Sequence, residues 1–253
     1  MHPLARLVVR NLTVVLNPGF LLWQVIFPLI YIFVAGFAYT AIIDSVEIDG
    51  NSLDYPAFLA TGMIGFAIMN STMVSGVIIW NDRRNGMFEQ ILSGPFTRSH
   101  YILGNVITIW IVGFASAGFI LAVGLPVFVG SAALGLNTLL FLTAATVAGS
   151  MLFGSIVSIL STRLKSNEGF SVILNTVFLF SAFVSTAFYP AEGAPEPLAT
   201  AFYLNPLTYL VDIIRAGIFG TVTDFVLMEA AVLSGAAVVL FVIAARLLTK
   251  LDF

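Results

Sequence analysis

The side chains best placed for polar chemistry lie between the last two strongly apolar stretches of the chain. Tyr209, Asp212 and Arg215 follow one another at three-residue intervals, which places them on one stripe of a helix and lets Asp212 and Arg215 form an ion pair. Asn205 can cap that helix, with Pro206 at its first position. Such a set does its chemistry by hydrogen bonding and charge pairing. It either holds the segment in shape or gates a pathway, and we favour the structural ion pair.

The length of this helix is the second informative feature. A helix from Pro206 to about Phe219 would be about 20 Å long, shorter than the roughly 30 Å hydrocarbon core of a bilayer. Pro206 also divides residues 190–222 into two pieces. The sequence therefore predicts a helical hairpin that enters one face of a membrane without crossing it. Broken elements of this kind line a pathway or a protein–protein seam.

A second candidate site is the polar segment 81–100, where Gly86 opens a short helix and Gly94 and Pro95 end it. A single apolar face is predicted for Met87, Phe88, Ile91 and Leu92, while Glu89 and Gln90 point away from it. Exposed apolar side chains on a short helix suit a groove on a partner protein. The alternative is a helix that rests on lipid headgroups, with anionic lipid bound by Arg83, Arg84 and Arg98.

Mildly polar and aromatic side chains recur within the apolar stretches. A cavity for an amphipathic substrate would need this mixture, although each residue taken singly is more often an interhelical hydrogen bond or a lipid contact. The candidate pathway residues are Asn70, Thr72, Asn105, Asn175 and Phe183.

Small and hydroxylated residues also recur at strict four-residue intervals, at Thr146, Ser150, Gly154, Ser158 and Thr162. Because small side chains let helix backbones approach closely, this stripe predicts a packing seam within the chain or across a dimer. A translocation surface is the alternative interpretation.

Several classes of chemistry lack the residues that they require. The chain has no cysteine, and its two histidines, His2 and His100, lie outside the apolar stretches, so we expect no metal or haem site. It contains no GxxxxGK[ST] loop, so ATP and its Mg²⁺ would have to be bound by another subunit. The net charge of −3 comes with no basic patch for nucleic acid. We expect no enzyme active site and no cofactor in this chain.

The composition indicates an all-α integral membrane protein, since 59% of residues are hydrophobic, 9% are charged and the mean hydropathy is +1.04. We interpret 1–253 as a single membrane domain. Long runs free of charge predict six transmembrane helices. Their ranges are about 20–43, 56–81, 101–129, 138–161, 170–189 and 225–245.

The basic residues orient this six-span arrangement. All but Arg215 fall on one side, which by the positive-inside rule is cytoplasmic, so both termini are expected there. These residues are Arg6, Arg10, Arg83, Arg84, Arg98, Arg163, Lys165, Arg246 and Lys250. Acids including Asp44, Glu47, Asp49, Asp54 and Glu192 fall on the opposite side. Residues 3–16 alternate apolar and basic positions with helical period, which predicts an amphipathic helix in the membrane interface.

The pattern F-Y-P, several prolines and then N-P-L-T-Y-x-V-D-x-x-R resembles the membrane subunits of type-2 ABC exporters. Within them it is most similar to the daunorubicin-resistance and nodulation-factor export permease group. The resemblance covers essentially the whole chain, because the length, the span number and the loop at 81–100 also fit. It implies a partner ATPase subunit that docks on a coupling helix at Gly86–Leu92. It also implies pairing of two permeases, as a homodimer or with a related chain.

Together these features predict a multi-pass permease of the plasma membrane that exports a hydrophobic or amphipathic substrate, such as a drug or a lipid-like molecule. Export of a polysaccharide or a lipid-linked oligosaccharide is the alternative within the same family. An ion-coupled secondary transporter is disfavoured, because the interiors of the first five predicted spans carry no ionisable residue that could serve as a relay.

Overall fold

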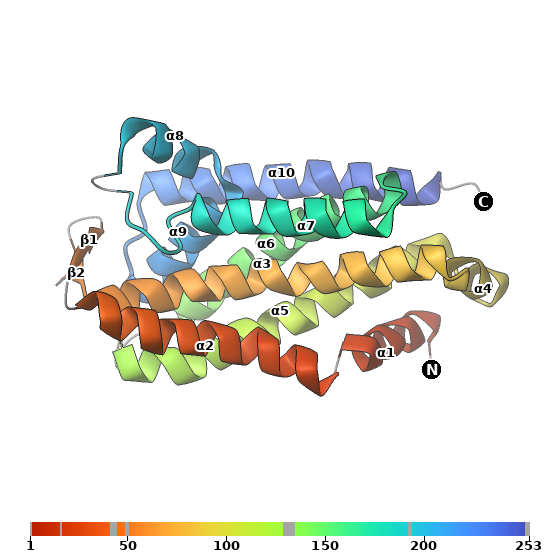
Figure 1. Ribbon diagram of the computed structural model, residues 1–253, viewed down its shortest axis with the longest axis horizontal. Helices are drawn as coiled ribbons and strands as arrows, with labels where there is room; N and C mark the ends of the chain where they lie inside the picture. Colours follow the sequence, from red (N-terminus) through yellow and green to blue (C-terminus); the bar gives the residue numbers. More distant parts are fainter. Residues whose placement is uncertain are drawn as a thin grey trace.

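The computed structural model describes residues 2–15, 17–40, 45–48, 51–128, 135–191 and 194–250, and these form an elongated bundle of helices (Figure 1). The helices are α1 (Pro3–Val15), α2 (Pro18–Thr40), α3 (Tyr55–Arg84), α4 (Met87–Ser93), α5 (Arg98–Phe128), α6 (Leu136–Arg163), α7 (Asn167–Phe183), α8 (Glu196–Leu204), α9 (Pro206–Phe219) and α10 (Asp224–Thr249). Two short antiparallel strands, β1 (Val46–Ile48) and β2 (Asn51–Leu53), join α2 to α3 with Val46 paired to Leu53. The sequence pattern had not indicated this hairpin.

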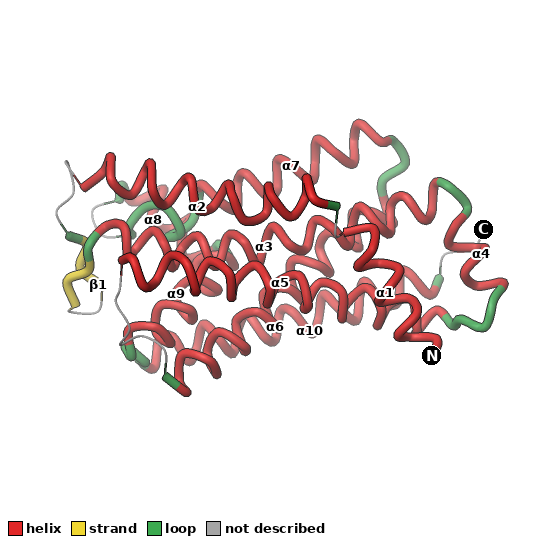
Figure 2. Tube along the Cα trace, turned by 90° about the horizontal axis from the view of Figure 1, so that it is seen from below, coloured by secondary structure: helices red, strands yellow, loops and turns green. Residues whose placement is uncertain are grey.

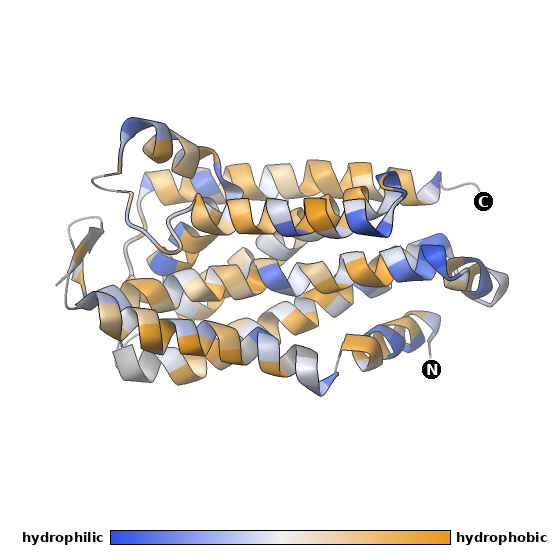
Figure 3. Cartoon of the chain, in the orientation of Figure 1, coloured by the Kyte–Doolittle hydropathy of each residue, from blue (hydrophilic) through white to orange (hydrophobic). Residues whose placement is uncertain are grey.

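Within the described residues, five helices are long and apolar enough to cross a membrane: Leu22–Thr40 of α2, and α3, α5, α6 and α10. Each agrees with a predicted span to within a few residues at the ends that can be compared. Apolar residues dominate the helices between the two ends of the bundle, and hydrophilic residues gather near α4 (Figure 3). This distribution is the one that a hydrocarbon layer requires.

The fifth predicted span, 170–189, is wrong at its C-terminal end. Helix α7 stops at Phe183 after 17 residues, which gives a length of about 26 Å. Residues 184–189 form bends and turns instead, although their apolar character continues that of the helix. Six spans and a hairpin that re-enters the membrane therefore stay predictions.

Helix α3 is the centre of the bundle, because it packs against α2, α5, α6 and α9. Its side chains are buried along nearly the whole length of the helix. Its fully buried side chains in the core include Phe58, Met63, Ile64, Ile68 and Met69. A helix that is apolar on all sides and enclosed by other apolar helices has a fixed place in the bundle. Helix α3 therefore connects the elements that lie at the two ends of the bundle.

The two ends of the bundle differ in what they carry (Figures 1 and 2). Helices α1 and α4 and the end of α10 lie at one end, whereas β1, β2, α8 and α9 lie at the other. The first and last helices therefore finish on the same side, as the sequence predicted, together with the basic ends of α3, α6 and α10. Which side is cytoplasmic stays a prediction. Asp44, Asp49 and Glu192 lie outside the described residues.

Helix α1 confirms the amphipathic pattern of residues 3–16. Leu7 and Val15 are buried, while Arg6 and Thr13 are exposed. The helix packs along α5. Because its buried face is covered by the bundle itself, α1 is attached to the protein and does not depend on lipid alone for its position. Its place in the membrane interface stays a prediction.

Candidate functional site

The irregular segment between α7 and α8 forms the first candidate site. Ser185, Thr186, Ala187 and Phe188 are buried although they belong to no helix. Their backbone groups must find partners among side chains, because they belong to no helix and are shielded from bulk solvent. The segment also lies tight against α3, since a Cβ atom built on Gly62 would fall 1.9 Å from the carbonyl oxygen of Ala187. Only glycine fits this approach.

Asn205 fastens the end of α7 to the start of α9. Its Oδ1 accepts a hydrogen bond from the Leu207 backbone N–H at 3.0 Å, so it caps α9 as predicted, with Pro206 in the first turn. Its amide nitrogen donates to the carbonyl oxygens of Ser181, at 2.8 Å, and Val184. One side chain therefore stabilises the start of α9 and satisfies carbonyls where α7 stops, which explains why α7 ends early.

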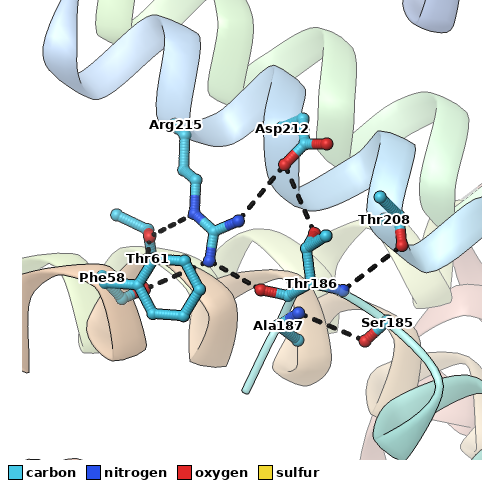
Figure 4. A network of polar contacts seen from close by, with 8 residues as sticks. All are labelled: Phe58, Thr61, Ser185, Thr186, Ala187, Thr208, Asp212 and Arg215. Carbon is cyan, nitrogen blue, oxygen red and sulfur yellow. Dashed lines mark hydrogen bonds and ion pairs between the residues drawn. The ribbon is translucent and has the colours of Figure 1, made fainter. Parts of the chain in front are cut away.

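Arg215 is the centre of this site, with only 3% of its surface exposed (Figure 4). Its guanidinium donates to Asp212 Oδ1 at 3.2 Å, which confirms the predicted pair. It also donates to the carbonyl oxygen of Thr186 at 2.8 Å and to Thr61 Oγ1 at 3.2 Å. The same group lies 3.9 Å from the centroid of the Phe58 ring, a cation–π contact. Arg215 thus joins α9 to α3 and to the irregular segment.

Threonine side chains complete the network. Thr186 Oγ1 donates to Asp212 Oδ1 at 3.3 Å, and the Thr186 backbone N–H donates to Thr208 Oγ1 at the same distance. Tyr209 lies apart from Arg215, because its hydroxyl donates to the carbonyl oxygen of Tyr203 on α8. The predicted stripe of three residues therefore serves two contacts: Asp212 and Arg215 hold the irregular segment, and Tyr209 holds α8.

This arrangement is suited to holding structure. Among the described residues, each partner of Arg215 is a hydrogen-bond acceptor or an aromatic face, and each contact is made by the folded chain itself. We name Arg215, Asp212, Thr186 and Thr61 the α9 latch. Sequence reasoning missed Thr186, Thr61 and Phe58, because nothing in a single sequence indicates which distant carbonyl or hydroxyl faces a buried arginine.

The second candidate site is α4, at the opposite end of the bundle. Gly86 precedes it with φ of 67°, a left-handed conformation that favours glycine. The expectation that its apolar residues are exposed is wrong for Phe88 and Ile91, which are 1% and 8% exposed. They pack into a cluster with Leu7, Ile79, Tyr101 and Leu248. The apolar face of α4 is therefore covered by a cluster to which α1, α3, α5 and α10 contribute side chains.

The surface that α4 leaves open is mixed in character. Met87 is 40% exposed, Glu89 and Gln90 are exposed, and Leu92 is half-buried. A partner that docks on this helix would therefore meet one thioether side chain and two polar ones, while Phe88 and Ile91 fix the helix to the bundle. The docking role of these residues stays a prediction.

A buried charge lies directly behind α4. Asp82 at the end of α3 pairs with Arg10 of α1 and accepts a hydrogen bond of 2.8 Å from the hydroxyl of Tyr101 on α5. Asn11 on α1 donates to Asn105 on α5 at 3.2 Å. Three helices are therefore joined by polar contacts at this level. Sequence reasoning used Arg10 only for topology, and an acid in the run Asn81–Arg84 was the signal that could have indicated the pair.

The candidate pathway residues do not gather in one place. Asn70 donates to Gln24 at 2.9 Å, Thr72 donates to the carbonyl oxygen of Met69, and Asn105 donates to that of Tyr101. Asn175 and Phe183 are exposed on α7. Asn70 thus joins α3 to α2, and Asn105 joins α5 to α1 through its contact with Asn11. Thr72 bonds to its own helix, and the other two face outward. A substrate role for any of them stays a prediction.

The chain matches the ABC-2 type transporter family over residues 5–219, which includes both candidate sites, and it belongs to that family. It is 27% identical over 169 residues to a probable multidrug ABC transporter permease, YbhR, of Escherichia coli K12. That match covers 65% of this chain and 44% of the relative, so the chain spans less than half of that protein's length.

Two further relatives are similar over more of their length. A putative transport permease, ycf38, of Pyropia yezoensis is 28% identical over 202 residues, which is 78% of this chain and 66% of the relative. Nodulation protein J of Rhizobium meliloti strain 1021 is 25% identical over 228 residues, or 88% of this chain and 83% of the relative. With the five apolar helices, the family membership identifies the chain as a multi-pass membrane protein.

Proposed function

We propose that this chain is the permease subunit of an ATP-driven exporter, powered by a separate ABC ATPase subunit that binds ATP and Mg²⁺. The observation that carries the proposal is the family match across residues 5–219, which takes in α4 and the α9 latch together. The substrate is hydrophobic or amphipathic, a drug or a lipid-like molecule. The names of the multidrug permease and nodulation protein J relatives support an export role.

The ATPase docks on the outer face of α4, at Met87, Glu89 and Gln90. Because Phe88 and Ile91 anchor α4 in a cluster with α1, α3, α5 and α10, a push on α4 displaces these helices together. The contact between Asp82, Arg10 and Tyr101 supports this transmission, since it joins α3 to α1 and α5 beside the cluster. A short helix without buried anchors would move alone and transmit little.

Helix α3 carries the motion to the other end. It has 30 residues, about 45 Å at the usual rise of an α-helix. Its last turns contact α4, and its first turns hold Phe58 and Thr61 against Arg215. A rigid shift of α3 therefore reaches α9 through the latch, and α8 and α9 close or open the exit of the pathway on the outer face of the membrane.

In the proposed arrangement both termini are cytoplasmic, α7 is the fifth of six spans, and α8 with α9 forms a re-entrant hairpin. Two permeases pair in the plasma membrane, as a homodimer or with a related chain. Each permease docks one ATPase subunit. ATP binding brings the two ATPase subunits together and so drives the two α4 helices toward each other.

Affinity purification from native membranes in mild detergent tests the proposal, with mass spectrometry to identify co-purifying subunits. The variant is Met87→Asp with Gln90→Lys, which alters the exposed face and leaves Phe88 in its cluster. The matched control is Ser99→Asp, an exposed position in the first turn of α5 at the same end. We expect an ATPase subunit with the wild type and the control, and its loss with the variant.

A wild-type chain that purifies alone, even after cross-linking in intact membranes, would remove the support for ATP-driven transport. Reconstitution then separates the remaining alternatives. Transport by the purified assembly in liposomes is expected to need ATP and to survive ionophores. Transport that persists without ATP and stops with the ionophore would establish an ion-coupled carrier instead. A glycan or lipid-linked oligosaccharide as the transported molecule would keep the mechanism and replace the substrate class.

A further inference from the structure

A small cavity lies among α3, α5, α6 and α10. Its volume is about 30 Å³, an order of magnitude below the roughly 300 Å³ of a site for a drug-sized ligand. It exceeds the space of about 10–15 Å³ that one water molecule requires. Its polar lining comes from Ser75, Asn105, Trp110, Ser150, Ser155 and Ser158, and the remaining walls are apolar. The size alone restricts any occupant to one or two small molecules.

Three polar atoms in this lining have no hydrogen-bond partner among the described residues: Ser75 Oγ, Trp110 Nε1 and Ser150 Oγ. The two serines are 2% and 0% exposed, so neither reaches water outside the protein. Each atom comes from a different helix, since Ser75 lies on α3, Trp110 on α5 and Ser150 on α6. Buried groups of this kind are nearly always bonded, to protein or to ordered water.

Two other serines of the same cavity provide an internal contrast. Ser155 donates to the carbonyl oxygen of Met151, and Ser158 donates to that of Gly154 at 2.7 Å. Their hydroxyls are satisfied by their own helix. The cavity thus has hydroxyls that need a partner and hydroxyls that do not, although all of them line the same space.

We propose that the cavity binds ordered water, one or two molecules, which completes the hydrogen bonds of Ser75, Trp110 and Ser150. The indole N–H donates to a water oxygen, and each serine hydroxyl either donates to water or accepts from it. A water molecule with about three protein partners is well held, and this site offers three from three helices. The water therefore links α3, α5 and α6.

Such a link differs from a direct side-chain bond. Water can keep two or three partners while the groups around it move relative to one another, because it reorients and shifts within the cavity. The stripe of Ser150, Gly154 and Ser158, predicted as a packing seam or a translocation surface, becomes a hydrated packing seam on this assignment. The inference rests on the cavity and its unsatisfied atoms, and it does not depend on the proposed exporter function.

Substitution of the serines tests the assignment through the sign of a stability change. In a dry cavity, Ser150 leaves a buried hydroxyl unsatisfied, so Ser150→Ala would raise the unfolding midpoint. In a hydrated cavity the same change takes a partner from the water, and we expect the midpoint to fall by about 2–4 °C. Ser75→Ala should behave alike. The matched control is Ser158→Ala, which removes a satisfied hydroxyl from the same lining and should change the midpoint less.

X-ray radiolytic labelling in lipid nanodiscs tests for the water itself, because bound water produces hydroxyl radicals where it lies. We expect fast oxidation of Trp110 and Met151, which line the cavity. Met73, which is half-buried like them and does not line the cavity, is the reference. The Ser75→Ala, Ser150→Ala double variant should slow labelling at the cavity. Labelling of Trp110 and Met151 no faster than that of the reference, or a raised midpoint for Ser150→Ala, would overturn the proposal.

Discussion

The two ends of the bundle each bury an ion pair, and the two pairs are mirror images in exposure. In the pair Arg10–Asp82, behind α4, the acid is 6% exposed and the arginine 29%. In the pair Asp212–Arg215, in the α9 latch, the arginine is 4% exposed and the acid 26%. At one end a buried anion is reached by a cation from the surface. At the other, a buried cation is reached by an anion.

This difference matters because the buried ion makes different contacts at the two ends. Arg215 donates to the backbone carbonyl of Thr186, which belongs to no helix, whereas among the described residues Asp82 accepts from a single tyrosine besides Arg10. We therefore expect substitutions in the α9 latch to destabilise the fold more than substitutions in the Arg10–Asp82 pair. The α4 end is then the better suited to move in response to a partner.

The largest effect is expected from Asp212→Ala, which removes the counter-ion of Arg215 and leaves a buried charge. We expect a loss of about 4 kcal/mol in the free energy of unfolding, as for other broken buried pairs. Titration with SDS in mixed micelles, followed by circular dichroism, measures it. The double variant Asp212→Leu, Arg215→Met removes both charges and should be less destabilised than the single one. If the single variant is as stable as wild type, Arg215 is not held by Asp212.

Phe88→Ala is expected to rank next, with a loss of about 3 kcal/mol, because it opens a cavity in the cluster that anchors α4. The matched variant is Met87→Ala, which truncates an exposed side chain and should leave the unfolding free energy within about 0.5 kcal/mol of wild type. Met87→Ala should instead weaken capture of the ATPase subunit. Equal destabilisation by both variants would contradict the division of α4 into an anchoring face and an open face.

What the sequence predicted at these two ends follows from the range of the interactions. The Asn205 cap and the Asp212–Arg215 pair were predicted because each depends on residues two or three positions apart, where helix geometry fixes the contact. The partners Thr61 and Phe58 lie more than 150 positions from Arg215, at separations of 154 and 157. Helical periodicity carries no information about such contacts.

The two wrong predictions have related causes. An apolar face at helical period indicates that something covers α4, but it does not distinguish a partner from the chain itself, which is why Phe88 and Ile91 were expected to be exposed. No charged residue interrupts the chain through residues 184–188, so the hydropathy pattern predicted helix where the chain turns. Burial alone does not specify helix once side chains such as Asn205 and Arg215 satisfy the backbone.

A third and smaller effect is expected from Gly62→Ala, which sharpens the comparison by changing the contact of α3 with the irregular segment while leaving every charge in place. The added Cβ would meet the Ala187 carbonyl, which is backbone and cannot turn aside. We expect a loss of about 2 kcal/mol, typical of overpacking. Gly118→Ala on α5 is the control, since its Cβ would meet nothing within 4 Å. A similar change in the free energy of unfolding for both variants would mean that α3 and this segment separate readily.

Arg10→Gln is expected to have the smallest effect, and it tests the mirror image directly. The glutamine keeps an amide donor for Asp82, and Asp82 also keeps the hydroxyl of Tyr101 as a donor, so we expect a loss of only about 1 kcal/mol. The same SDS titration measures it, with Arg6→Gln on the exposed face of α1 as the control. A loss of stability as large as that of Asp212→Ala would show that the two ends are equally sensitive to the loss of one member of their ion pair. In this variant α1 stays packed on the bundle through Leu7, while its ion pair with α3 is lost. A small loss in stability accompanied by weaker ATPase stimulation would therefore mean that the Arg10–Asp82 pair transmits motion rather than anchors α1.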